Sequence, residues 1–82
     1  MKTVLDNVTV ASKTSTEFKA KAGESINVNL SLTGTVSLQR KNVGDWVEVQ
    51  SITTTTTYAV ANNMVFRLVV TANAGVIGAE IV

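Results

Sequence analysis

Apolar and polar residues alternate with a period of two along most of the chain, which is the pattern of half-buried β-strands. The clearest case is the segment 25–32, in which every second residue is apolar: Ile26, Val28, Leu30 and Leu32. No segment holds the 3.6-residue period of an amphipathic helix. The pattern therefore predicts strands separated by turns.

Further strands follow from the same alternation, at residues 8–11, 17–22, 35–39, 46–52, 53–60, 64–72 and 76–82. Residues 35–39 and 46–52 are predicted to form a hairpin across residues 42–45, a loop rich in turn-forming residues. Residues 64–72 are apolar on both faces, which is typical of a strand at the centre of a sandwich or of one covered by a partner. Gly23 in "KAGES" is expected to take a positive φ.

We expect an all-β fold with about seven or eight short strands, arranged as a small antiparallel β-sandwich, Ig-like, or as a partly open barrel. No linker divides the sequence, so residues 1–82 are interpreted as one domain. The predicted core residues are apolar positions on alternating strand faces: Ile26, Val28, Leu30, Val36, Leu38, Val47, Val49, Phe66 and Leu68.

Five consecutive threonines, Thr53 to Thr57, stand out as a possible functional surface. A ladder of threonines could bind ice or a polymer, but such a ladder needs several strands with threonine in the same register, and this sequence has one. Threonine is also a common strand residue on half-buried surfaces. The run is therefore interpreted as an edge or interface strand.

The composition indicates a domain that relies on a partner for part of its stability. Hydrophobic residues make up 45% of the chain and charged residues only 16%, and there is no cysteine or histidine. A chain of 82 residues buries a thin core, and disulfides and structural zinc are not available to reinforce it. Homo-oligomerisation or docking on a larger protein is the remaining means.

Catalysis by Ser-His or Cys-His pairs is excluded because neither a histidine nor a cysteine is present. The few carboxylates fall mostly in turns or on outward faces, so no enzyme and no cofactor are expected. Asn42 and Asp45 could contribute to a calcium site, but they are also ordinary turn formers. Arg40, Lys41 and Trp46 could clamp single-stranded nucleic acid, but the net charge of +1 gives little attraction. We expect no nucleic-acid partner and no membrane span.

From Gly34 onward the sequence resembles small β-sandwich structural proteins of tailed bacteriophages, both capsid decoration and tail-associated. The shared features are a "GTVSLQR" strand, a turn with Gly44, a tryptophan, a threonine-rich strand and "FRLVVTA". The resemblance covers residues 34–82. The turn before Trp46 is shorter here than in the usual pattern.

The resemblance implies a virion protein, synthesised in the host cytoplasm. The first expectation is a capsid decoration, or cement, protein that binds the major capsid protein or another virion protein and stabilises the assembled head, with a homotrimer favoured. The alternative is a tail or neck component, or a carbohydrate-binding module that uses Trp46 and Tyr58. Residues 1–10 are expected to form a partner-binding arm. The expected contact residues are Met1, Lys2, Thr3, Val4, Leu5, Trp46, Thr53, Thr55, Thr57, Val65 and Val69.

Overall fold

A computed structural model describes residues 2–82 and shows, within that range, nine β-strands and no helix. The strands are β1 (Lys2–Val8), β2 (Lys13–Thr14), β3 (Phe18–Ala20), β4 (Ser25–Leu30), β5 (Thr35–Asn42), β6 (Asp45–Ile52), β7 (Thr56–Ala59), β8 (Met64–Thr71) and β9 (Ile77–Ile81).

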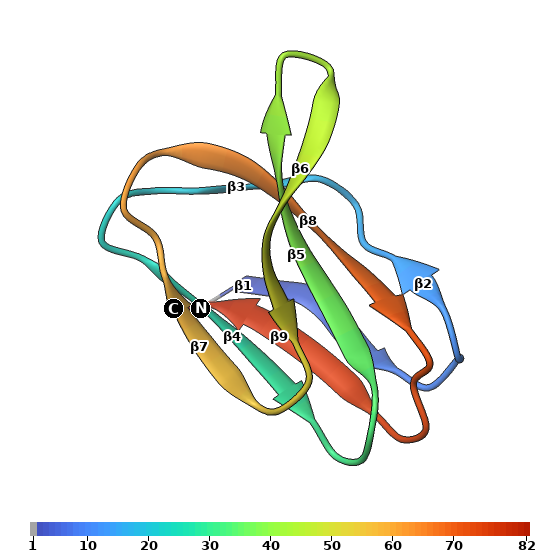
Figure 1. Cartoon of the computed structure of the whole chain (residues 1–82). Helices are drawn as coiled ribbons and strands as arrows, with labels where there is room; N and C mark the ends of the chain where they lie inside the picture. Colours follow the sequence, from blue (N-terminus) through green and yellow to red (C-terminus); the bar gives the residue numbers. More distant parts are fainter. Residues whose placement is uncertain (1) are drawn as a thin grey trace.

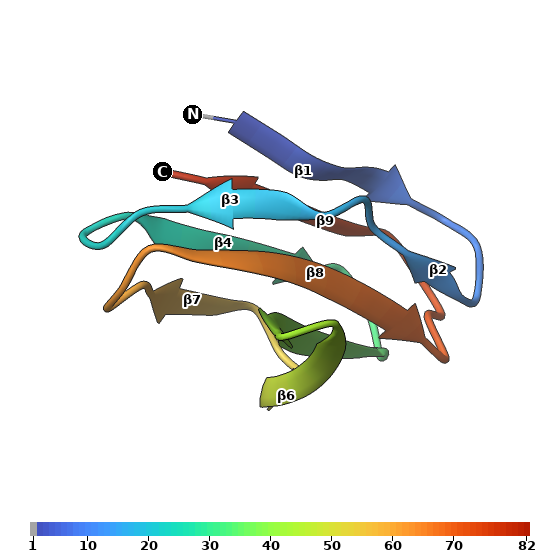
Figure 2. The same ribbon diagram turned by 90° about the horizontal axis from the view of Figure 1, so that it is seen from above.

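The strands form two antiparallel sheets that pack face to face as a sandwich (Figure 1). One sheet has the order β1-β9-β4-β7, and the other has the order β2-β8-β5-β6, with β3 also pairing with β8. The start of β1 lies beside the end of β9, where Lys2 pairs with Ile81 (Figures 1 and 2). The predicted all-β sandwich is confirmed, with nine strands where seven or eight were expected.

The core lies between the sheets and is built by the predicted alternation. On β8, Phe66, Leu68 and Val70 are buried, and on β4, Ile26 and Val28 are fully buried. Three of the predicted core residues are not fully buried. Leu30 and Val49 are only partly buried, and Val47 is 38% exposed. The other buried apolar residues come from β1, β3, β5, β6 and β9 and from the loop after β7: Leu5, Val8, Phe18, Ala20, Val36, Leu38, Ile52, Val60, Ile77, Ala79 and Ile81.

Residues 2–8 of the expected N-terminal arm form a strand at the edge of the four-stranded sheet, and the binding of a partner by residues 1–10 stays a prediction. β1 pairs with β9, and its register shifts twice between Thr3 and Val8. Asn7 takes a positive φ of 40°. Because of this irregularity, the two buried residues Leu5 and Val8 are three positions apart and break the period of two. The prediction of a strand at residues 8–11 is wrong, because β1 ends at Val8. Val10 lies exposed in the loop after β1.

The edge beside β8 is formed by an interrupted strand, because β2 and β3 pair with the two ends of β8. Ser15 bridges the gap between them. Its backbone N–H donates to the carbonyl of Leu68 at 2.8 Å, and its hydroxyl accepts the N–H of Leu68 at 2.9 Å. Short, interrupted edge strands are one way in which proteins discourage pairing with other chains.

The predicted β5–β6 hairpin is confirmed and projects beyond the end of the sandwich (Figure 1). Its two-residue turn consists of Val43 and Gly44, with φ values of 51° and 94°, as a type I′ turn requires. A bulge lies opposite Leu38 and Gln39. Val47 pairs with Arg40 at the base of the projecting part, where the pairing of β5 with β8 ends, and its side chain is exposed.

The threonine run is not one continuous strand. Its first part connects the two sheets, and its last part begins an edge strand. Thr53 to Thr55 cross from one sheet to the other, and Thr56 begins β7. β7 pairs only with β4, so it is the edge of the four-stranded sheet, as expected for the end of the run. The hydroxyl of Thr55 lies 3.2 Å from the N–H of Leu30, which donates to it and so ties the crossing segment to β4.

Candidate interaction surface

The outer face of the five-stranded sheet carries half-buried apolar and aromatic side chains beside charged ones. Val65, Arg67 and Val69 alternate with the buried residues of β8, so they point away from the core. Val65 pairs with Lys19 of β3, and Val69 lies between Thr14 and Ser37. We call this surface the Trp46 face; it consists of Ser37, Gln39, Trp46, Glu48, Val65, Arg67 and Val69.

Trp46 is held in place on this face by a chain of side-chain contacts across three strands. The guanidinium of Arg67 lies over the indole ring, 4.5 Å from its centroid, as in a cation–π contact. The Nε of Arg67 donates to Oε1 of Gln39 at 2.6 Å, and Nε2 of Gln39 donates to the Ser37 hydroxyl at 3.1 Å. That hydroxyl donates to Glu48 Oε1 at 2.7 Å.

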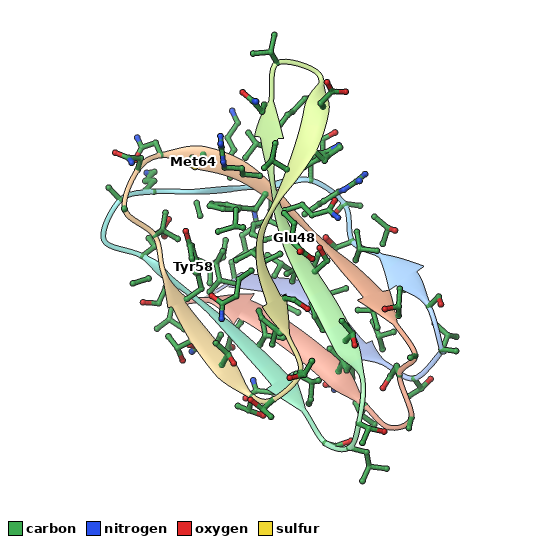
Figure 3. The ribbon with its side chains drawn as sticks, viewed as in Figure 1. Glu48, Tyr58 and Met64 are labelled. Carbon is green, nitrogen blue, oxygen red and sulfur yellow. The ribbon has the colours of Figure 1, made fainter. Side chains whose placement is uncertain are left out.

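The residues that hold the Trp46 side chain in place lie on strands and not on loops. Arg67 lies on the central strand β8, and Ser37 and Gln39 lie on β5, which is paired on both sides. Glu48, which accepts the last hydrogen bond of this chain, lies on β6 (Figure 3). Side chains that are ordered before binding lose less conformational entropy when a partner covers them. This face can therefore act as a preorganised contact surface.

The structure brings together three of the expected contact residues, Trp46, Val65 and Val69, on this one face. It does not bring the others to it. Leu5 is in the core with 4% exposure and cannot contact a partner in this fold, which is a correction. Met1 lies outside the described residues. The remaining expected residues lie on β1, on the crossing segment or on β7: Lys2, Thr3, Val4, Thr53, Thr55 and Thr57.

The outer face of the four-stranded sheet is polar and chemically different. A row of paired residues crosses it in the order Thr3, Glu80, Asn27 and Thr57. The Thr57 hydroxyl donates to Oδ1 of Asn27 at 2.8 Å. This row has no apolar or aromatic anchor, so it is a weaker candidate for a protein contact surface than the Trp46 face.

The two aromatic residues proposed for carbohydrate binding do not share a surface. Tyr58 packs edge-on against the core residue Phe66, with ring centroids 6.1 Å apart, and its side chain points into the sandwich (Figure 3). Trp46 lies on the other sheet, and Arg67 covers one face of its ring. The pair therefore does not form a shared aromatic platform for a sugar.

The carboxylates of residues 2–82 do not gather into a metal-binding cluster. Among residues 2–82, no group of three or more Asp, Glu, His or Cys is placed to hold a metal ion. Asn42 and Asp45, the candidate calcium ligands, are cross-strand partners at the hairpin turn. The described part of the chain also has no helix long and apolar enough to cross a membrane.

Arg67, Gln39, Ser37 and Glu48 were not singled out from the sequence. Whether these side chains contact one another depends on the register between β5, β6 and β8. The bulge in the hairpin shifts that register by one residue. The alternation alone indicates that Arg67 and Gln39 both fall on outward positions of neighbouring strands. Without the strand order, however, the sequence does not indicate that they touch.

Comparisons with protein-family models, with curated proteins and with solved structures returned no match. The resemblance to bacteriophage structural proteins therefore stays a prediction from the sequence.

Proposed function

We propose that this protein is a non-enzymatic virion structural protein that binds and stabilises an assembled bacteriophage head as a decoration protein. The resemblance of residues 34–82 to such proteins gives the class, and the Trp46 face gives a means of attachment. In this proposal the partner is the major capsid protein, and the decoration protein sits on the capsid surface.

The observation that carries the proposal is the ordered Trp46–Arg67 pair beside Val65 and Val69. Tryptophan and arginine are enriched among the residues that dominate protein–protein binding energy. Here both are held on strands by the contacts through Gln39 to Ser37. A rigid, partly apolar sheet face suits a flat, repetitive protein lattice better than it suits a small substrate, which needs a concave site.

A protein that binds only the assembled head stabilises that head by mass action. We expect purified protein added to undecorated, expanded heads to cosediment with them up to a saturating ratio. We also expect it to raise the temperature at which the heads release DNA. Light scattering of the free protein measures its oligomeric state, for which a trimer is expected. Failure to bind expanded heads, with the protein found by mass spectrometry only in tails, would assign it to the tail or neck instead.

A further inference from the structure

A basic cavity with an apolar floor opens at the end of the sandwich, beside the stem of the β5–β6 hairpin. Its volume is about 520 Å³, within the range of roughly 300 to 1,000 Å³ that is common for binding pockets. Four basic residues line it, from β3, from the turn after β3 and from β5: Lys19, Lys21, Arg40 and Lys41.

The cavity forms because the pairing of β5 with β8 stops before the end of β8 is reached. The pairing of β5 with β8 stops at Arg40 and Phe66. Beyond this point, β5 continues into the projecting hairpin, while Met64 and Val65 of β8 pair with β3 alone. Met64 lies in the gap at this end of the sandwich (Figure 3). Together with Ala20, Met64 and Val65 form the apolar part of the lining.

The positive charge of this cavity is gathered by the fold, since the basic residues are dispersed in the sequence. Four of the seven basic residues of the chain line it, and no Asp or Glu among residues 2–82 does so. Glu17 offsets part of this charge, because its carboxylate lies 3.3 Å from Nζ of Lys41. Glu24 is engaged nearby, where it accepts the backbone N–H of Lys21 at 2.6 Å.

We propose that this cavity binds a short acidic peptide segment of a partner protein, with an aliphatic side chain on the apolar floor and carboxylates at the basic rim. Three lysines provide point charges for carboxylates, and Arg40 adds a fork for a bidentate contact. The open side of β8 at Met64 and Val65 provides backbone groups for pairing with an extended peptide. This site does not depend on the protein being a virion component.

The lining favours a peptide over single-stranded nucleic acid. Recognition of single strands relies on aromatic side chains that stack on bases. No aromatic residue in the described chain lines the cavity. Phe18 and Phe66 are stacked in the core and Arg67 covers Trp46, so the neighbouring aromatic rings are already engaged.

The test is an NMR titration of the isotope-labelled protein with a capped synthetic peptide, Gly-Asp-Leu-Asp-Leu-Gly, in low salt. We expect shift changes centred on the amides of Lys19, Arg40 and Met64. The double variant Lys19→Gln, Lys41→Gln should weaken binding about tenfold. The matched control Lys13→Gln removes an exposed lysine on β2, outside the cavity, and should leave binding unchanged.

Several results would overturn this proposal. One is the absence of shift changes at millimolar peptide. A second is equal binding of the same peptide with Asn in place of Asp, since the carboxylates would then play no part. Equal binding of a peptide with Gly in place of Leu would show that the apolar floor does not contribute to binding. Tighter binding of an oligothymidylate than of the peptide, at the same residues, would reassign the cavity to nucleic acid.

Discussion

At the scale of single residues, Val43 has an unfavourable backbone conformation at the tip of the hairpin. Its φ is 51° and its side chain is 99% exposed, so it gains nothing from burial. A left-handed conformation costs an L-residue about 1 to 2 kcal/mol, and it is worse for a β-branched one. Asn-Gly is the preferred pair for a type I′ turn.

We therefore expect Val43→Asn to stabilise the protein by about 1 kcal/mol. Urea unfolding followed by circular dichroism measures the change. Val10→Asn is the matched control, because Val10 is also exposed but does not have a positive φ. If both substitutions shift the unfolding midpoint equally, the gain comes from surface polarity and not from the turn.

At the scale of elements, Asn73 joins the loop after β1 to the loop after β8. Its Nδ2 donates to the carbonyls of Val8 and Val10 at 3.0 and 3.1 Å. Its Oδ1 accepts the N–H of Gly75 at 3.0 Å. These bonds satisfy backbone groups at the last paired residue of the irregular strand β1 and in the loop after it.

Replacing Asn73 with Ala leaves these backbone groups without their partners, at least one of them in a buried position. We expect a loss of about 1 to 3 kcal/mol in the free energy of unfolding. Asn73→Asp should be similarly damaging, because a carboxylate cannot donate to the two carbonyls. The control is Asn63→Ala, which removes one exposed bond to the N–H of Ala22. A smaller loss for Asn73→Ala than for Asn63→Ala would contradict this account.

The period of two predicted most strands because a sandwich buries one face of each strand. It failed where a strand is irregular, at Asn7 in β1, and where a strand passes beyond the opposite sheet, at Val47. It also failed at Leu32, which lies in the bend after β4 and is 65% exposed. Strand boundaries of this kind depend on long-range packing and not on the local pattern.

The candidate site was only partly predictable for the same reason. Val65 and Val69 were recognisable as surplus apolar residues on a strand whose other face is core. The contact of Arg67 with Trp46 joins residues of two strands that are separated by β5, so it needs the strand order. The basic cavity likewise requires the point at which β5 and β8 separate.

At the scale of the whole molecule, the two sheets present different surfaces to the outside. The four-stranded sheet has the polar row from Thr3 to Thr57, and the five-stranded sheet has the Trp46 face. This asymmetry gives a small sandwich one surface suited to a protein partner and one suited to water. The proposed attachment to a capsid would place the five-stranded sheet against the partner.

The most direct test is the binding of Val69→Asp to undecorated, expanded heads, compared with wild type in a cosedimentation titration. Val69 points outward, so the variant should keep the circular dichroism spectrum of the wild type. A buried charge at the centre of the contact should weaken binding at least about tenfold. Val10→Asp, on a loop outside the Trp46 face, should bind like wild type. If wild type binds and folded Val69→Asp binds with equal affinity, the Trp46 face is not the attachment surface.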